Sequence, residues 1–570
     1  MNYREIGTIR KSRRPRTRIA AVYPNTYHVG MSNLGFQTVY RLFNEMEDII
    51  CERAFVPDKS DTSRVRTVES GAFLSDFDII AFSISYENDY PGILRIFDKA
   101  RIPPRSCDRT GDHPLVIAGG VACFLNPEPI AAFIDCFLIG EAEVMLPRFL
   151  IGIKEFSGSD RIEYLKMLAK EVPGVYVPEF YRSIYHKDGA VLEPLYDDVP
   201  AKIPRVYLKD LSLSPSCTAV LTPDTAFPDT FLIETARGCP HGCRFCAAGY
   251  VYRPPRFRPV SLLKQCMETG AALTRKIGLL GAAVSDLPGL PELCRDTEHI
   301  DISFSSLRAD ALTPEIVSVL KRNKVKTATI APDAGSERMR RVINKGITEE
   351  HILNAADILV SNDIPNLKLY FMVGLPAETI PDVEAIIGLC RQIKQTFLSS
   401  SRIKKRIGEI TVSLNAFVPK PFTPFQWAAM DDVRTLKKKI TLVKEGLRGV
   451  ANLHVKADIP SVGYLQALFS RGDRQIADLL SVGYENKGNW AKTLKEFPIH
   501  TDQYVCRERS ADENFPWEII AHGVRRSFLA QEYRKALKAE TTAPCKAGFK
   551  PALHNGESCK LCGGCEKSEK

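Results

Sequence analysis

The chain has 570 residues, of which 44% are hydrophobic and 25% are charged, and its formal net charge is +9. This is an ordinary globular composition, and the length corresponds to roughly three or four domains. No apolar run approaches the roughly 18 residues of a membrane span, and no apolar signal-peptide core follows the basic N-terminus. We therefore expect a cytoplasmic protein without a membrane span. The modest positive charge indicates either a solvated basic surface or contact with an acidic partner such as RNA.

The first zone, residues 1–150, alternates short apolar strands with amphipathic helices. The expected strands are 19–23, 79–84, 115–118 and 133–139, and the expected helices are 34–46 and 92–100. Such alternation, with turn residues where the strands end, predicts a doubly wound, Rossmann-like parallel sheet. Ligands of such sheets bind at the carboxyl ends of the strands.

A second α/β zone follows a proline-rich segment. We expect residues 151–228 to be a linker region and residues 229–455 to form the next domain. Its strand candidates are 231–235, 277–280, 302–305, 327–330, 367–373 and 410–415, and helical patterns at 262–273, 315–321, 350–360 and 383–397 lie between them. Six units are fewer than the eight of a closed barrel, which predicts a partial (β/α)6 barrel. Residues 456–570 are expected to be a mixed C-terminal region.

Three cysteines directly after the first strand of this second zone carry the strongest chemical signal. Cys239, Cys243 and Cys246 have C-x3-C-x2-C spacing, and clustered cysteines in a large chain without a signal peptide favour metal over disulfides. Thiolates suit iron–sulfur clusters, and three ligands leave one iron of a 4Fe–4S cluster open for a substrate. The alternative is a zinc site, in which His241 would have to supply the fourth ligand from inside the loop.

The cysteine loop resembles that of the radical S-adenosylmethionine (SAM) superfamily, in which an aromatic residue, here Phe245, precedes the last cysteine. The resemblance implies that SAM binds the open iron through its methionyl group. One electron, from a donor such as flavodoxin or ferredoxin, then cleaves SAM to methionine and a 5′-deoxyadenosyl radical. The catalytic residues that act on the substrate remain unassigned.

The resemblance extends to the later strand ends of residues 229–420. By their positions it implies SAM contacts from Phe245, Gly281, Ala282, Ser305, Arg308, Asp333, Gly335, Val373 and Gly374. One departure concerns the methionyl amine, because Gly281-Ala282-Ala283 stands where the family usually has Gly-Gly-Glu. The acid is missing there and Asp286 lies three residues on, so the amine contact stays open.

Residues 18–150 resemble the cobalamin-binding domain that precedes the SAM domain in one large subgroup. The cues are Gly119-Gly120, the motif at 126–129, Gly140-Glu141 and, far downstream, the motif Ser470-Arg471-Gly472-Asp473-Arg474. The resemblance places cobalamin at Thr26, His28, Gly30, Ser85, Tyr86, Glu87, Gly119, Gly120, Gly140 and Glu141. The cobalt-ligating D-x-H-x-x-G signature is absent, so cobalamin would bind without a histidine ligand and His28 is a structural or pocket-lining residue. A cofactor-free sheet domain is the alternative.

The C-terminal tail carries four more cysteines, Cys545, Cys559, Cys562 and Cys565, with C-x13-C-x2-C-x2-C spacing. Close C-x2-C pairs indicate a second metal site but do not name the metal. An auxiliary iron–sulfur cluster and a structural zinc both fit, and unliganded cysteines are the alternative. Lys546, Lys550, Lys560 and Lys567 contribute positive charge to this tail.

These features lead to an expected reaction class. The resemblance implies an attack on a C–H bond of an unknown substrate, with methyl transfer if cobalamin is bound. Methylthiotransferase-like modification of tRNA or protein is a second possibility, but it requires three clustered cysteines in the N-terminal domain. Here Cys51, Cys107, Cys123 and Cys136 are scattered. A zinc-ribbon nucleic-acid-binding protein is a third interpretation, but it leaves the six strand–helix units unexplained.

Overall fold

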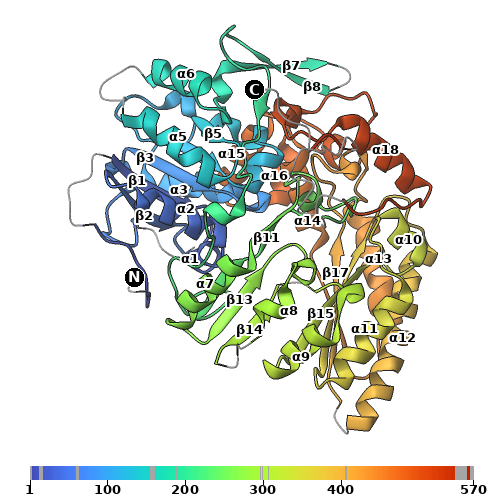
Figure 1. Cartoon of the computed structure of the whole chain (residues 1–570). Helices are drawn as coiled ribbons and strands as arrows, with labels where there is room; N and C mark the ends of the chain where they lie inside the picture. The colour runs from blue at the N-terminus through green and yellow to red at the C-terminus, as the bar shows by residue number, and fades with distance from the viewer. Residues whose placement is uncertain are drawn as a thin grey trace. The chain divides into compact units, whose positions relative to one another are not determined.

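The chain divides into two compact units (Figure 1). The computed structural model describes residues 3–11, 17–58, 63–154, 161–186, 189–295, 297, 299–305, 307–404, 407–545 and 562–564. Unit 1 comprises Met1–Thr230, Leu468–Tyr504 and Asp512–His522, and unit 2 comprises Phe231–Ala467, Val505–Ala511 and Gly523–Lys570. The C-terminal region is therefore shared between the two units.

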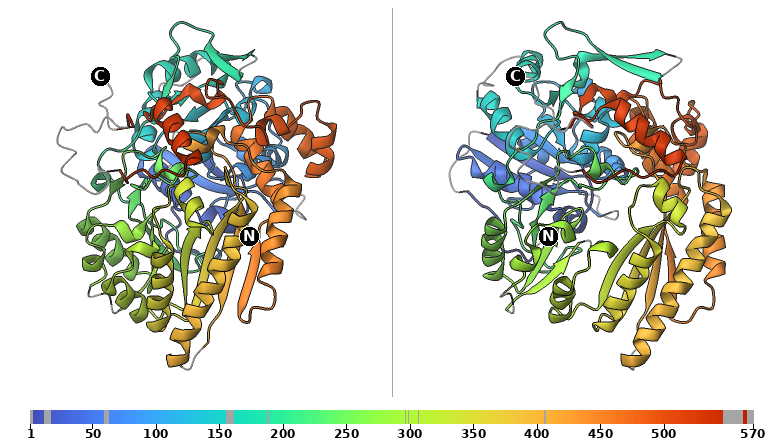
Figure 2. Two further views of the ribbon diagram at one scale, coloured as in Figure 1. Left: turned by 90° about the vertical axis from the view of Figure 1, so that its right-hand side faces the viewer. Right: turned by 45° about the vertical axis from the view of Figure 1, so that its right-hand side comes forward.

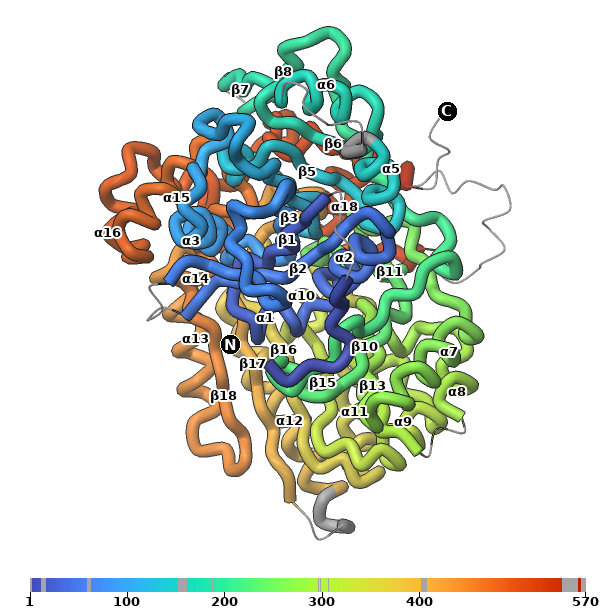
Figure 3. The backbone as a smooth tube through the Cα atoms, turned by 90° about the vertical axis from the view of Figure 1, so that its left-hand side faces the viewer, coloured from blue at the N-terminus to red at the C-terminus, as the bar shows by residue number. Residues whose placement is uncertain are grey.

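Unit 1 is built on a six-stranded sheet in the order β2-β1-β3-β4-β5-β6. The strands are β1 (Thr17–Tyr23), β2 (Ile49–Phe55), β3 (Ile79–Ser83), β4 (Leu115–Gly119), β5 (Cys136–Leu138) and β6 (Val175–Tyr176). Strands β1 to β5 are parallel, whereas β6 is antiparallel to β5. Figure 3 shows β1, β2 and β3 side by side, with helix α2 (Leu34–Glu45) alongside. The doubly wound, Rossmann-like prediction is confirmed.

Strand β2 was not expected, because its sequence includes the charged pair Glu52-Arg53. Both side chains are buried, and Arg53 forms ion pairs with Glu5 at 2.7 Å and with Glu69 at 2.6 Å. Paired charges of this kind can be buried, whereas a hydrophobicity pattern registers them as surface positions.

The helices of unit 1 come from distant parts of the sequence. The first group is α1 (Tyr27–Met31), α2, α3 (Tyr90–Ala100), α4 (Val121–Leu125), α5 (Ala142–Lys154) and α6 (Arg161–Glu171). The segment expected to be a linker supplies α6, β6, the hairpin β7 (Tyr181–His186) and β8 (Gly189–Pro194), and β9 (Ile203–Pro204), which pairs with β19 (Ile520–Ala521). The C-terminal region adds α15 (Ile476–Glu485), α16 (Trp490–Glu496) and most of α17 (Asp502–Val505).

Two motifs singled out in the sequence meet inside unit 1. The side-chain amide of Asn126 donates to the carbonyl oxygens of Ser470 at 3.1 Å and Gly472 at 2.7 Å. Arg474 forms an ion pair with Glu128 at 3.0 Å, and both Asn126 and Glu128 are completely buried. The motif at 126–129 therefore holds the C-terminal helices to the sheet.

Unit 2 contains the six strands predicted for the partial barrel. They are β10 (Thr230–Glu234), β13 (Lys276–Leu280), β14 (Asp301–Phe304), β15 (Thr327–Asp333), β16 (Asn366–Val373) and β17 (Ile410–Ala416), and β18 (Leu453–Ala457) adds a seventh. They pair as a three-stranded sheet, β10-β13-β14, and a four-stranded sheet, β15-β16-β17-β18. No hydrogen-bonded closure of these sheets occurs among the described residues, which agrees with an open, partial barrel.

Helices follow the strands of unit 2 as the pattern predicted. They are α7 (Val260–Ala271), α8 (Leu290–Leu293), α9 (Pro314–Arg322), α10 (Glu337–Val342), α11 (Glu349–Ser361), α12 (Ile380–Lys404), α13 (Val433–Gly446) and α14 (Pro460–Arg471). Figure 2 shows α12, the long helix, lying along the yellow-to-orange strands. Helices α11, α12 and α13 are successive neighbours, so they cover the four-stranded sheet as one layer.

Helix α18 (Arg526–Leu537) completes unit 2. Its Tyr533 packs against Phe425 and Trp427, at ring-centroid distances of 6.2 Å in both cases. Its buried Ala536 belongs to the same apolar core as Phe417 and Phe425. None of the helices in the described part of the chain is both long and apolar enough to cross a bilayer.

Candidate functional site

The cysteine loop follows β10 and β11 (Ala236–Arg237) at the carboxyl end of the three-stranded sheet. Gly238 has φ +81°, and a Cβ there would lie 2.8 Å from the Tyr252 carbonyl oxygen, so only glycine allows this turn. The backbone N–H of His241 donates to the Cys239 sulfur, and those of Ala248 and Gly249 donate to the Cys246 sulfur. Amides that point at sulfur stabilise thiolates, which is what a cluster loop requires.

The charges of the three cysteine thiols in the loop act on one another. Burial and the neighbouring Cys243 raise the pKa of Cys239 to about 12, and burial raises the pKa of Cys243 to about 11. The thiols are thus close enough for their charges to interact. Yet no three His, Cys, Asp or Glu side chains of the described residues converge on a point that one metal ion could occupy. A 4Fe–4S cluster binds each thiolate at a different iron, so its ligands need not converge.

Two ion pairs lie beside the thiols, and both come from later strand ends. Lys345, which follows α10, pairs with Asp333 at the end of β15, and Arg308 pairs with Asp310 at 2.9 Å. Burial lowers the pKa of Lys345, but the charges of Asp333 and Cys243 outweigh it and raise that pKa overall. A largely buried ammonium therefore lies close enough to the Cys243 thiol to interact with it. No sequence pattern pointed to Lys345, because it follows helix α10 and not a strand.

His241, considered as a zinc ligand, has another partner. Its Nε2 lies 2.6 Å from the Asp286 carboxylate, and Asp286 also interacts with Cys239. Asp286 is the acid that lies three residues beyond the position where the family has its glutamate. The structure thus brings this carboxylate to the cysteine loop from the end of β13.

Arg244, between the second and third cysteines, joins the loop to the C-terminal segment. It is completely buried and donates two hydrogen bonds to Glu532 of α18, at 3.2 and 3.0 Å. It also donates to the carbonyl oxygens of Val342 at 3.0 Å and Glu540 at 2.8 Å. A single arginine in a glycine-rich loop is typical of a solvent-exposed position, so the buried contacts of Arg244 were not predicted.

Residues 540–545 lie across the same loop. Asn344 exchanges two hydrogen bonds with the backbone of Thr542 (2.8 and 3.1 Å) and donates a third to the Gly242 carbonyl oxygen. The N–H of Cys545 donates to the carbonyl oxygen of Pro240 at 2.7 Å. The C-terminal segment therefore supports the cysteine loop directly.

The expected SAM contacts lie at successive carboxyl ends of strands. After β13 and β14, the Gly281 N–H donates to the Ser305 hydroxyl at 3.2 Å, which in turn donates to the Gly281 carbonyl oxygen at 3.1 Å. Ala282 is exposed beside them, and Phe245 packs against the apolar core that contains Ala334. These positions share one edge of the strands, as an extended ligand would require.

Two further glycines of this set are fixed by packing. A Cβ on Gly335 would lie 2.2 Å from the backbone nitrogen of Ile386 in α12, so only glycine fits there. Gly374, after Val373 at the end of β16, has φ +83° and donates its N–H to Glu378 at 2.8 Å.

The Gly374 turn is held by a buried ion network. Lys439 of α13 contacts Glu378 at 2.8 Å and Asp431 at 2.7 Å. Burial raises the pKa of Glu378, although Lys439 opposes this shift. Glu378 is therefore a positioning residue for the turn expected to meet the adenine of SAM.

In unit 1 several cobalamin candidates reach the carboxyl edge of the sheet. Gly120 follows Gly119 with φ +109°, and a Cβ there would lie 2.3 Å from the Ile84 carbonyl oxygen. Ser85 accepts a hydrogen bond from Asn33 at 3.1 Å. Nearby, Asn25 donates to the buried Asp89 at 2.7 Å, and burial raises the pKa of Asp89 to about 6.

The remaining candidates take several roles. Thr26 precedes α1, where His28 is exposed, and Tyr86 is exposed while Glu87 is buried. Three of them have a structural role within unit 1. Gly30 would clash with Phe55 if it carried a Cβ, Gly140 would clash with the Val206 carbonyl oxygen, and Glu141 accepts the Leu208 N–H at 3.0 Å.

Two of the four tail cysteines lie in the described residues, and both are beside Arg253. Arg253 donates a hydrogen bond to Cys562, and the charges of Cys562 and Cys545 raise the pKa of Arg253 against burial. Cys562 is buried, and its carbonyl oxygen accepts the Arg525 N–H at 2.9 Å. Cys559 and Cys565 lie outside the described residues.

Comparisons with known proteins show which family this chain resembles. Residues 35–178 match the family described as "Radical SAM proteins, N-terminal", and residues 233–390 match the "Radical SAM superfamily". An uncharacterised protein of Methanocaldococcus jannaschii is 32% identical over 496 residues, which cover 86% of this chain and 96% of that protein.

A second relative and a solved structure share smaller or more distant similarity. A tRNA-2-methylthio-N(6)-dimethylallyladenosine synthase of Carboxydothermus hydrogenoformans is 27% identical over 199 residues, covering 32% of this chain and 45% of that enzyme. The structure of the radical SAM methyltransferase TsrM from Kitasatospora setae, with cobalamin and a [4Fe-4S] cluster bound, has a TM-score of 0.50 and 13% sequence identity. That match covers 82% of this chain and 99% of the TsrM chain, and it shows a shared fold.

Proposed function

This chain belongs to the radical SAM superfamily, and from that premise we propose that it cleaves SAM reductively and directs the resulting radical at a C–H bond of its substrate. The observation that carries the proposal is the loop of Cys239, Cys243 and Cys246. Its backbone amides donate to the sulfurs, and the charge of the largely buried Lys345 acts on Cys243. An electron donor of the flavodoxin or ferredoxin type would complete the reaction.

The protein's own residues bind and orient the reactants. When bound, a 4Fe–4S cluster supplies one electron to the SAM sulfonium, which splits into methionine and a 5′-deoxyadenosyl radical. Lys345 and Arg308 provide positive charge for the methionyl carboxylate, and Asp286 provides a carboxylate for the amine. The Gly374 turn, held by Glu378, presents backbone groups to the adenine.

We further propose that unit 1 binds cobalamin and that the reaction is a methyl transfer. Two observations support this proposal. The Rossmann-like sheet has two residues without side chains, Gly119 and Gly120, at the end of β4, and the chain's fold is shared with the cobalamin-bound TsrM structure. His28 is exposed on the five-residue helix α1, consistent with a cofactor bound without a histidine ligand. Cobalamin would supply the methyl group, and unit 1 would hold it and shield it from water.

Methylthiotransferase-like modification is the second candidate, favoured by the similarity to the tRNA-modifying enzyme. Three thiols for another cluster would then be needed in the N-terminal domain. Cys51, Cys123 and Cys136 are buried on three different strands or helices of unit 1, whereas Cys107 is exposed. This scatter favours methyl transfer over methylthiolation.

The test is anaerobic reconstitution with iron, sulfide, SAM, a reductant and either cobalamin or buffer. We expect 5′-deoxyadenosine in both reactions and methylated products of a cell extract only with cobalamin. Products that gain a methylthio group would favour the second candidate. Absence of deoxyadenosine from protein that contains a full cluster would contradict SAM cleavage itself.

A further inference from the structure

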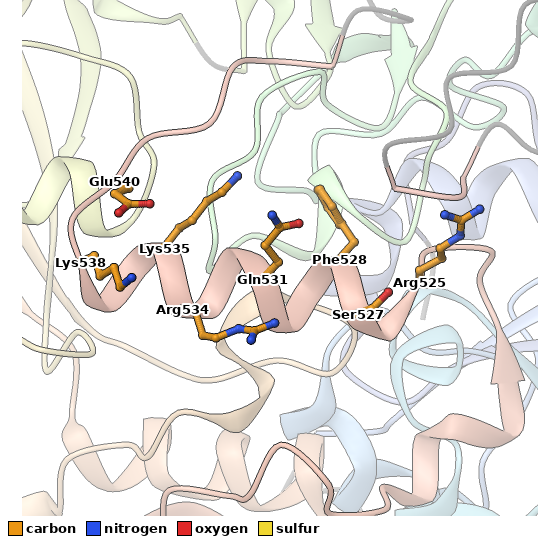
Figure 4. A pocket seen from close by; sticks show the side chains of 8 residues that line it. All are labelled: Arg525, Ser527, Phe528, Gln531, Arg534, Lys535, Lys538 and Glu540. Carbon is orange, nitrogen blue, oxygen red and sulfur yellow. The ribbon is translucent and has the colours of Figure 1, made fainter.

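A basic hollow runs along the solvent side of α18, at the end of unit 2. The pocket has a volume of about 640 Å³, and Figure 4 shows its side chains spread along the helix, with Arg525 at one end and Lys538 and Glu540 at the other. Its lining residues are Arg525, Ser527, Phe528, Gln531, Arg534, Lys535, Lys538 and Glu540, and we call it the α18 pocket. Among these described residues four are cationic and one is a carboxylate.

The two sides of α18 differ in their exposure to solvent. Its inward residues Leu529, Glu532 and Ala536 are buried, whereas Gln531 and Arg534 are exposed, as helical periodicity requires. The helix is therefore held by its inner side and leaves its basic side for another molecule.

Two of the four cations of this surface have no ion pair within the described residues. Arg534 and Lys538 form no ion pair there, although like charges four residues apart destabilise a helix. Lys535 pairs with Glu532 at 2.9 Å, but Glu532 also pairs with buried Arg244, so two cations share one carboxylate.

The helix dipole explains only part of this arrangement. It favours Lys535 and Lys538 near the C-terminal end of α18. It disfavours Arg525, which is the N-cap residue. The cations thus extend over the whole helix, a span of about 20 Å at 1.5 Å per residue. That is long enough for several phosphates of one nucleic-acid strand, which follow each other at roughly 3.4 Å along the axis.

From this we propose that the α18 pocket is a docking surface for the phosphodiester backbone of a nucleic acid. The surface is joined to the reaction centre, because Glu532 on the inner side of α18 binds Arg244 inside the cysteine loop. A docked strand would therefore be held next to that loop. A nucleic-acid substrate follows only if the proposed radical chemistry holds, whereas the docking surface does not depend on it.

The test measures binding and chemistry separately on the full-length, cluster-loaded protein. A fluorescein-labelled 20-nucleotide RNA of mixed sequence, and DNA of the same sequence, are titrated at 50, 100 and 200 mM KCl, with anisotropy as the readout. The variant is R534E/K538E. The matched control is K437E/K438E, which makes the same charge change on the exposed side of α13, where a second basic hollow of about 400 Å³ includes both lysines.

We expect R534E/K538E to weaken binding at least about tenfold and to reduce the slope of log K against log salt by about 1.4, for two lost phosphate contacts on a single strand. K437E/K438E should stay within about twofold of wild type. Deoxyadenosine formation without substrate should be unchanged in both variants, so that loss of radical chemistry is distinguishable from loss of docking.

Three outcomes would overturn the proposal. The first is an equal loss of affinity in both variants, which would show that net charge alone attracts the strand. The second is wild-type protein that binds neither RNA nor DNA at 100 mM KCl. The third is pocket-dependent binding to vesicles of anionic phospholipid without affinity for either oligonucleotide, which would assign the surface to another anion.

Discussion

Arg244, in the middle of the cysteine loop, donates two hydrogen bonds to Glu532, a residue 288 positions later in the sequence. Both side chains are essentially inaccessible to solvent. Helix α18 therefore fixes the loop that would hold the cluster through this buried ion pair. Glu532 also accepts hydrogen bonds from Lys535 and Thr542, so the same carboxylate fixes the segment that crosses the loop.

Replacing Arg244 by Met should destabilise the apoprotein strongly. The change leaves Glu532 buried with less positive charge around it, a situation that costs about 3–5 kcal/mol. We expect the thermal transition of unit 2 to fall by roughly 5–15 °C. Arg338→Met, which removes a half-exposed arginine of the Asp382 ion pair, is the control and should cost far less. If R244M/E532Q is no more stable than R244M, the two residues are not coupled.

Replacing Cys243 by Ala should abolish SAM cleavage, because loss of one thiolate exposes the cluster to solvent and to loss of iron. We expect the iron bound at this loop, about four atoms, to be lost and deoxyadenosine to fall at least about 100-fold. Cys390→Ala is the control, since Cys390 is also a buried free cysteine and lies in α12, away from the cysteine loop in sequence. Deoxyadenosine at the wild-type rate from C243A would contradict the assignment of the cluster.

Replacing Lys345 by Met should raise the KM for SAM about 10–100-fold, because a charge-assisted contact to the carboxylate is lost. It should also make the reduction potential of the cluster more negative, since a nearby positive charge is removed. Lys345→Arg should retain part of the affinity, and Lys321→Met, in an exposed ion pair on α9, should change neither quantity. An unchanged KM with an unchanged potential would remove Lys345 from the site.

The stability of unit 1 should depend on pH through Asp89. Burial raises its pKa to about 6 from its ordinary value of 3.8, so the folded protein holds this proton more tightly than the unfolded chain does. Its contribution to stability is therefore fully present below about pH 4 and is lost as the pH rises through 6.

Asp89→Asn should consequently stabilise the protein at pH 8, by up to about 3 kcal/mol, and should be nearly neutral at pH 4. The measurement is the difference in unfolding temperature between the two proteins at each pH. The same difference at both pH values would show that Asp89 is not the titrating group.

Serine substitutions of Cys545, Cys559, Cys562 and Cys565 test the tail. If they form one centre, each should remove the same metal, about four irons for a cluster or one zinc for a structural site. SAM cleavage should persist in the Cys559 and Cys565 variants, because the barrel cysteines lie about 300 residues away in sequence. Metal content unchanged in all four variants would show that these cysteines bind nothing.

Much of the fold could be predicted from local sequence patterns. Short apolar runs separated by amphipathic segments predicted all six barrel strands, because about every second residue of such a strand is buried, as in β16 and β17. Strand β2 was missed because its buried charges Glu52 and Arg53 find partners that only the fold supplies. In the site, the spacing of Cys239, Cys243 and Cys246 was informative by itself. Lys345, Arg244 and Glu532 were not, because their roles depend on contacts between residues far apart in sequence.

Unit 1 is assembled from three segments that are far apart in the sequence, and this has a consequence for synthesis on the ribosome. Asn126 and Glu128 are buried against Gly472 and Arg474, and β9 pairs with β19 at Ile520–Ala521. At about 5–20 residues per second, translation from residue 230 to residue 522 takes roughly 15–60 s. During that interval the nascent N-terminal sheet lacks partners for these polar groups. We therefore expect it to be protease-sensitive and a client of chaperones until the chain is almost complete.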